Sequence, residues 1–218
     1  VGELVKRFGG TKVLIHYGGG SVVRSGLLQQ VRDALDKEGI SYVELGGAQP
    51  NPRSGLVYEG IELCRKEGVD FILSIGGGSA IDSGKAIALG VPYDGDFWDF
   101  YSFKVVPVQA LKHGCVLTLP ATGTEGSNSS VITHEDGMIK RGLPSDFNRP
   151  AFSILNPELT YSLPEYQTTC GIVDMMAHIL ERYFTNTTDV DLTDRMSEGV
   201  LKAIIKAGPV AVKEPENY

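Results

Sequence analysis

One stretch, "FILSIGGGSAIDSGKAIALG" at residues 71–90, constrains the fold of this chain more than any other. It places three consecutive glycines between an apolar run and a segment with helical character. Each glycine costs roughly 0.5–1 kcal/mol relative to alanine in regular structure, so the backbone must need to approach another group closely. A strand, glycines and a helix in this order are typical of phosphate binding, because free N–H groups and the helix dipole both favour an anion.

Two familiar phosphate-binding motifs do not fit this stretch. The dinucleotide fingerprint G-x-G-x-x-G matches Gly76 and Gly78 but has Ile81 in place of its third glycine. The P-loop needs a glycine where Ser79 stands and a Ser or Thr where Ala86 stands. What is left is either a general pyrophosphate-binding turn or a tight structural turn packed on a neighbour.

The phosphate-binding interpretation gives the residues of this turn separate roles. The pyrophosphate would approach the backbone of Gly76, Gly77 and Gly78. Ser79 would cap the following helix, and Lys85 would lie two turns into it. Asp82 is expected to contact a hydrogen-bond donor beyond the phosphates, because phosphate would repel its charge.

A second triple glycine, in "HYGGGSVVRSG", follows the apolar run at residues 12–18. Two such turns in one open parallel sheet are expected along the same carboxyl edge, where ligands bind. No acidic residue follows the strand to bond a ribose 2′-hydroxyl, whereas Gly19, Gly20 and Ser21 leave room and a donor for a 2′-phosphate. Arg24 either helps to neutralise that phosphate or is simply solvated. This turn predicts a preference for NADP(H) over NAD(H).

A third glycine turn, "TLPATGTEGSNSS", carries several hydroxyl groups. Those of Thr118, Thr122, Thr124 and Ser127 suit sugar and phosphate oxygens. The alternative is an ordinary solvated loop.

Apolar runs at 12–18, 41–46, 71–78 and 115–123 predict buried strands, and helical spacing over 21–40 and 51–69 predicts helices between them. This alternation predicts a doubly wound, mostly parallel α/β domain over residues 1–160. From Ser162, a candidate N-cap, the pattern becomes helical, and Asp191 or Thr193 is expected to cap a second helix. Residues 161–218 are therefore expected to begin an all-helical domain.

Charge and composition exclude several classes of partner. A formal net charge of −7 gives no basic field for nucleic acid, and no apolar run approaches the length of a membrane span. The chain is expected to be cytoplasmic. Cys64, Cys115 and Cys170 stand singly and are expected to be reduced core residues rather than disulfides or metal ligands.

The helical segment "GIVDMMAHILE" carries a candidate metal site. Asp174 and His178 are four residues apart, so both lie on one helix face. The apolar neighbours of His178 suggest a dry environment, suited either to a ligand or base or to a structural histidine. Two ligands are only part of a catalytic metal site, so further ligands would have to come from elsewhere.

Together, "GGGSAIDSGKAIA", "TLPATGTE", "ILNPELTYSLP" and "GIVDMMAHILERYF" resemble the iron-containing alcohol dehydrogenase family. "YGGGSVVRSGLLQQV" and "DRMSEGVL" are most similar to its NADPH-dependent butanol dehydrogenase and aldehyde reductase branch. The resemblance covers nearly the whole chain, which is expected to be truncated at both ends. Asn156 stands where the family often has aspartate.

The resemblance implies a set of site residues. Asp82 would lie on the nicotinamide side of the pyrophosphate turn. Asp174 and His178 would be two of the four ligands of a divalent metal ion, Fe²⁺ or Zn²⁺. Positions that line the dinucleotide are matched by Thr118, Leu119, Ser127, Lys140 and Leu159.

The implied reaction is hydride transfer between NADP(H) and an alcohol/aldehyde pair, with a homodimer or higher oligomer as the full-length assembly. Two alternatives stay open. One is an enzyme similar to glycerol dehydrogenase or dehydroquinate synthase on the same fold, and the other is a non-catalytic nucleotide-binding module.

Overall fold

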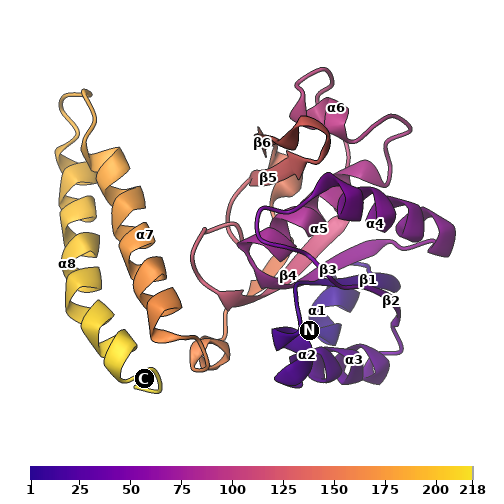
Figure 1. Ribbon diagram of the computed structural model, residues 1–218, viewed down its shortest axis with the longest axis horizontal. Coiled ribbons are helices and arrows are strands. Elements are labelled where there is room, and N and C mark those ends of the chain that lie inside the picture. The colour runs from indigo at the N-terminus through magenta and orange to yellow at the C-terminus, as the bar shows by residue number, and fades with distance from the viewer. Residues whose placement is uncertain (218) are drawn as a thin grey trace. The chain divides into compact units, whose positions relative to one another are not determined.

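The computed structural model describes residues 1–217 (Figure 1). Contacts divide the chain into two compact units, one made of Val1–Thr118 and Gly123–Leu155, the other of Leu119–Thr122 and the chain from Asn156 on. The elements of the first unit are α1 (Gly2–Arg7), β1 (Lys12–Tyr17), α2 (Ser21–Arg24), α3 (Leu27–Lys37), β2 (Ser41–Leu45), α4 (Ser54–Glu67), β3 (Phe71–Gly77), α5 (Gly78–Gly90), α6 (Trp98–Tyr101), β4 (Lys112–Leu119), β5 (Ser129–His134), η1 (Asp136–Met138), β6 (Ile139–Pro144), η2 (Asp146–Asn148) and β7 (Phe152–Ile154). Those of the second are η3 (Pro157–Thr160), α7 (Glu165–Tyr183) and α8 (Asp191–Lys213).

The first unit is built on a five-stranded sheet with the order β2-β1-β3-β4-β7. Strand β1 pairs in parallel with β2 and with β3, and β4 pairs in parallel with β7. Helices α1, α2 and α3 lie on one side of the sheet and α4 and α5 on the other (Figure 1). The prediction of a doubly wound, mostly parallel α/β fold is confirmed.

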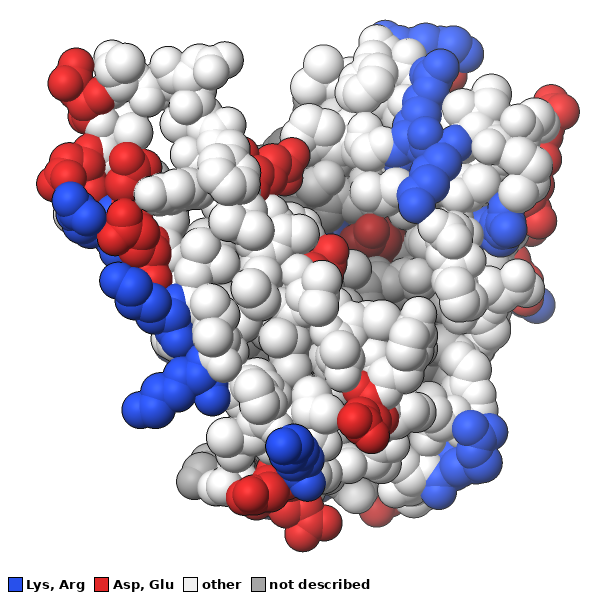
Figure 2. Space-filling view, turned by 60° about the vertical axis from the view of Figure 1, so that its left-hand side comes forward, with Lys and Arg blue, Asp and Glu red and all other residues white. Residues whose placement is uncertain are grey.

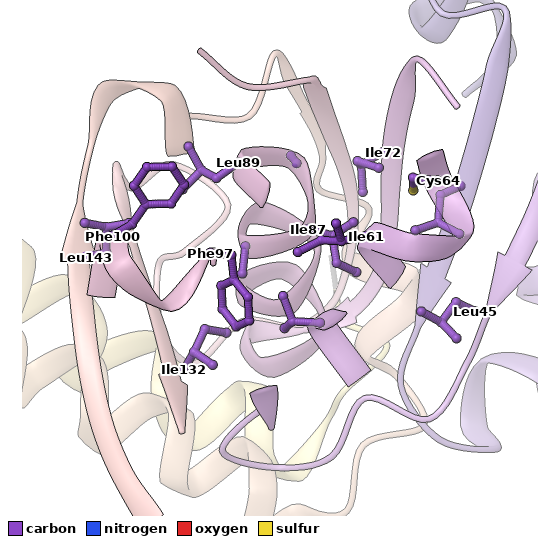
Figure 3. Packing of buried hydrophobic residues seen from close by; sticks show 14 of the residues in the cluster. Leu45, Ile61, Cys64, Ile72, Ile87, Leu89, Phe97, Phe100, Ile132 and Leu143 are labelled. Atoms are coloured by element: carbon purple, nitrogen blue, oxygen red, sulfur yellow. The ribbon is translucent and has the colours of Figure 1, made fainter. Parts of the chain in front are cut away.

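Helix α5 is the centre of this unit. It packs against β3, α4 and the antiparallel hairpin β5–β6, so almost all of its residues are buried. Figure 3 shows Ile87 and Leu89 of α5 among side chains of α4 and of both hairpin strands, including Ile61, Ile132 and Leu143. A helix whose apolar side chains point in several directions is stable only when it is enclosed in this way. The glycine turn at its N-terminus is therefore held on a rigid support.

Two parts of the sheet architecture were not predicted. The β5–β6 hairpin was not predicted because its first strand begins with Ser129 and Ser130, and serine is not typical of strands. Strand β7 has only three residues, and its pairing with β4 is a long-range contact.

Several predicted helix boundaries were wrong. The expected helix over 21–40 is two helices, because Gly26 adopts a left-handed conformation with φ of +77° between α2 and α3. Ser79 does not cap α5, because the helix begins one residue earlier and its N-cap is Gly77. Helix α4 ends at Gly68, which adopts the left-handed conformation common at helix C-termini.

The expected caps of the two long helices were also wrong. Helix α7 begins at Glu165 with Pro164 as its N-cap, so Ser162 lies outside it. Helix α8 begins at Asp191, so its N-cap residue is Val190, whose side chain makes no capping hydrogen bond.

The second unit consists mainly of the helical hairpin α7–α8. Figure 2 shows acidic side chains gathered toward the end of the pair where α8 begins and basic ones further along, which complements a helix dipole. Several large apolar side chains of the pair are exposed, among them Val173, Leu192, Met196 and Ile205. Within residues 1–217, no helix combines the length and apolarity that crossing a membrane requires.

All three cysteines are free thiols. Cys64 and Cys115 are buried, as expected for core residues. Cys170 is exposed on α7, so the prediction of a core position was wrong for it.

Two buried histidines make the stability of the first unit depend on pH. His16 of β1 is 0% exposed and His113 of β4 is 3% exposed. Both flank Ser74 of β3: His16 lies opposite it in the sheet register, and His113 forms a hydrogen bond with it. Burial lowers the pKa of His16 to about 4 and that of His113 to about 3. In the unfolded chain both titrate near 6.5, so the unfolded state takes up protons first as the pH falls.

We therefore expect the free energy of unfolding to fall between pH 6.5 and pH 4. The loss at pH 5 should be about 2 kcal/mol for each of the two histidines. Urea denaturation at pH 7, 6 and 5 measures it, with His113→Gln expected to reduce the slope and the partly exposed His134→Gln to leave it unchanged. An identical slope in His113→Gln would contradict this account.

Candidate functional site

Two glycine turns meet at the carboxyl edge of the sheet. Gly76 at the end of β3 has a φ of +153°, and an added β-carbon would lie 2.9 Å from the Ala80 Cβ and 3.9 Å from the backbone nitrogen of Gly18. Helix α5 begins beside this point and carries no acidic residue in its first turn. The free N–H groups and the positive end of the helix dipole therefore lie at an edge where the glycines contribute no side chains. The expected shared edge is confirmed.

The turn after β1 is open and has a cation beside it. A β-carbon at Gly19 would meet no atom within 4 Å, whereas one at Gly20 would lie 2.5 Å from the Arg24 Nη1. The acidic Glu44 of β2 is engaged by Arg32, at 2.6 and 2.8 Å. The turn thus offers exposed backbone and a guanidinium group, which suits an anion. Arg24 is itself exposed, so its two interpretations, a phosphate partner and a solvated side chain, both stay open.

Asp82 and Lys85 of α5 point to the loop after β4. The Asp82 carboxylate accepts hydrogen bonds from the Thr124 hydroxyl at 2.5 Å and from the Val131 N–H at 2.9 Å. The expectation that Asp82 contacts hydrogen-bond donors is confirmed. Burial raises the pKa of Asp82, and burial lowers the pKa of Lys85 to about 8. Lys85 is therefore mostly protonated at pH 7.

The other predicted dinucleotide residues fall in both units. Ser21 begins α2 and Thr118 lies near the end of β4, while Ser127 accepts a hydrogen bond from the Ser129 N–H at 2.8 Å. Leu119 and Leu159 belong to the second unit. Their contacts with a dinucleotide, like those of Gly77, Gly78 and Ser79, stay predictions.

Asn51 lies beside the predicted site residue Lys140, and the sequence analysis did not identify it as a candidate. The exposed Lys140 of β6 donates a hydrogen bond to the Asn51 Oδ1 at 2.6 Å. Asn51 has a positive φ of 56°, which asparagine tolerates better than most residues. Its position between two prolines, Pro50 and Pro52, was the available signal of a special turn.

The second unit encloses a cavity of about 170 Å³ beside the start of α7. Leu119, Thr160, Gly171 and Met175 are among its lining residues, and its surface is mostly apolar. Leu119 is thus the one predicted dinucleotide residue in the lining.

The candidate metal ligands lie together on α7. The His178 Nδ1 lies 2.9 Å from the backbone carbonyl oxygen of Asp174 and 3.5 Å from its carboxylate. Since a carbonyl oxygen only accepts, Nδ1 carries the proton and Nε2 keeps its lone pair for a metal. Carboxylate oxygen and imidazole nitrogen both suit Fe²⁺ or Zn²⁺, so the pair fits as part of a site.

The pair alone does not complete a metal site. Among residues 1–217, no group of three or more potential ligand side chains comes together. The two side chains are 50% and 47% exposed, so the expectation of a dry environment around His178 was wrong for this chain. Metal binding by Asp174 and His178 stays a prediction.

The fold and the paired glycine turns define an α/β protein with two glycine turns at the carboxyl edge of its sheet. Residues 1–157 match the model of the family described as "Iron-containing alcohol dehydrogenase", and the chain belongs to that family. The matched region ends before the candidate metal ligands.

Named relatives agree with this assignment. The chain is 49% identical over 213 residues to the "Probable NADH-dependent butanol dehydrogenase 2" of Bacillus subtilis, covering 98% of this chain and 54% of that protein. It is 41% identical over 210 residues to the "NADPH-dependent aldehyde reductase YqhD" of Escherichia coli, covering 95% and 54%. The crystal structure of a NADH-dependent butanol dehydrogenase A from Thermotoga maritima superimposes with a TM-score of 0.96 at 41% identity, over 100% of this chain and 55% of that one. The chain thus spans about half the length of these relatives.

Proposed function

We propose that the chain forms the nucleotide-binding part, and the beginning of the metal-binding part, of an NADP(H)-dependent alcohol dehydrogenase that reduces aldehydes. The observation that carries this proposal is the meeting of two bare glycine turns at the N-terminus of α5, with Arg24 beside one of them. Family membership and the names of the relatives support the class of reaction.

The cofactor preference is the finer part of the proposal. The relatives' names include both NADH-dependent and NADPH-dependent enzymes, so they do not decide between the cofactors. In this chain the turn after β1 has no carboxylate for a ribose 2′-hydroxyl, and Arg24 supplies a positive charge for a 2′-phosphate. The pyrophosphate would lie on the backbone of Gly76, Gly77 and Gly78, and the nicotinamide would extend toward Asp82.

Asp174 and His178 would hold the divalent metal together with ligands from outside residues 1–217. When bound, that metal polarises the carbonyl oxygen as a Lewis acid. The glycine turns keep the dinucleotide in place by backbone contacts, and the hydrogen bond from the His178 Nδ1 to the Asp174 carbonyl orients the imidazole. Iron and zinc both suit this ligand pair, and a homodimer or higher oligomer stays a prediction.

A turnover assay with the full reading frame tests the proposal. We expect NADPH to be consumed with butyraldehyde or another simple aldehyde. No consumption with any simple aldehyde, in protein that holds its metal, would overturn the dehydrogenase proposal. A lyase-type reaction or glycerol oxidation would then point to the alternative enzymes of the same fold.

The non-catalytic alternative is favoured by one observation, the incomplete ligand set of residues 1–217. Metal analysis of this chain and of the full-length protein distinguishes the two cases. We expect a stoichiometric ion in the full-length protein and little metal in the chain alone. Metal absent from both would favour a nucleotide-binding module.

A further inference from the structure

Lys85 is a buried lysine that makes four hydrogen bonds within one short segment. Its side chain is 1% exposed, although it lies on the helix that begins at the glycine turn. Its ammonium group lies 2.7 Å from the Thr124 carbonyl, 2.8 Å from the Thr124 hydroxyl, 3.0 Å from the Ser127 carbonyl and 2.9 Å from the Ser129 carbonyl. An ammonium has three donors, so these four oxygens leave none for a phosphate.

Asp82 binds the same segment from one turn earlier on the helix. Its two carboxylate oxygens accept from the Thr124 hydroxyl and from the Val131 N–H. The Thr124 hydroxyl thus joins the two charged groups, since it accepts from Lys85 and donates to Asp82. Helix α5 therefore holds residues 124–131, here called the clamped loop, at its beginning, middle and end.

The clamp joins two parts of the candidate dinucleotide site. The clamped loop includes Ser127, and the glycine turn begins the helix that bears Lys85. Burying an ammonium group is costly, and here that cost is offset by hydrogen bonds to loop oxygens that an apolar side chain could not donate to. A lysine here needs a reason beyond filling the core.

We propose that Lys85 is a positioning residue for dinucleotide binding. It fixes the clamped loop against α5, so that the loop and the glycine turn meet the cofactor as one rigid unit. Lys85 itself does not touch the cofactor. This inference rests on the proposed dinucleotide function.

The test compares NADPH binding to variants of the full-length protein. Lys85→Met keeps the bulk and removes the charge, and Thr124→Val keeps the shape and removes the hydroxyl that links the two charged groups. The Kd for NADPH, measured by its fluorescence on binding, should rise by about tenfold or more in Lys85→Met and by a smaller factor in Thr124→Val. Lys104→Met, at a lysine that is 69% exposed, is the matched control and should bind NADPH as the wild type does.

Two further readouts separate positioning from simple stabilisation. The kcat at saturating NADPH should change much less than the KM for NADPH, because the reacting groups are untouched. Hydrogen exchange of the clamped loop should speed up in Lys85→Met, while the exchange of β1 stays as in the wild type.

A pH profile adds a signature specific to the ammonium group. Wild-type affinity for NADPH should weaken as the pH rises through about 8, where Lys85 loses its proton, and this step should be absent in Lys85→Met. The titratable and charged groups that interact electrostatically with Lys85 are Asp82, His113, Cys115, Glu125 and Arg149. Burial raises the pKa of Cys115, and Cys115→Ala should retain the step if Lys85 causes it.

Each possible result of these measurements either supports or overturns the positioning role of Lys85. Unchanged NADPH affinity in folded Lys85→Met, with only a lower melting temperature, would overturn the positioning role and leave the proposed function intact. If Lys85→Met does not fold, Thr124→Val decides in the same way. Wild-type protein that binds no dinucleotide would overturn both the proposed function and this inference.

Discussion

Replacement of His178 by alanine in the full-length protein is expected to abolish aldehyde reduction and to release most of the bound metal. His178 would contribute one nitrogen ligand, and its Nδ1 contact with the Asp174 carbonyl leaves only Nε2 for the ion. Removal of a group that only hydrogen-bonds to a metal ligand already costs about 10–100-fold in metal affinity or activity, so loss of a direct ligand should cost at least about 100-fold. Activity and metal content per subunit are measured together.

The control for this experiment is Glu181→Ala, which removes an exposed carboxylate from the same helix. It should leave both metal content and activity as in the wild type. Asp174→Ala should behave as His178→Ala does. Full metal content in His178→Ala would show that α7 does not provide this ligand.

The second large effect is expected at Gly20. Gly20→Asp places a carboxylate where the 2′-phosphate of NADP(H) is proposed to bind, and the new side chain also meets the flexible end of Arg24. Repulsion and the loss of the free guanidinium should cost about 2–3 kcal/mol in NADPH recognition, or about 30–150-fold in kcat/KM. NADH, which lacks that phosphate, should lose little, so the preference shifts toward NADH.

Gly20→Ala is the matched control, because it adds the same β-carbon without a charge. It should keep the preference for NADPH, even if steric contact with Arg24 lowers the affinity for both cofactors. An unchanged preference for NADPH in Gly20→Asp would show that this turn is not at the 2′ position.

Local patterns predicted most of the sheet and the position of the site within it. The apolar runs ending in glycines located β1 and β3, and the rule for parallel sheets placed both turns at one edge. Helix caps were harder to predict from the sequence. Ser79 and Ser162 fit an N-cap pattern, but the N-caps in the structure are Gly77 and Pro164. A cap depends on where the helix starts, and tertiary packing moves that point by a few residues.

Long-range contacts decided what the charged side chains do. The sequence placed Lys85 two turns into its helix without naming a partner for it, and its four partners lie about 40 residues away along the chain. Asn51 and Lys140, 89 residues apart, likewise meet only because the chain folds β6 close to the turn after β2. No local periodicity encodes such pairs.

The amino-acid sequence by itself therefore determined the α/β class, the glycine turns and the shared helix face of Asp174 and His178, because each depends on residues near one another along the chain. The tertiary structure alone decided that Asp82 and Lys85 bind the clamped loop. The physical reason is that a charged side chain buried on folding takes whichever partners the packed chain brings to it.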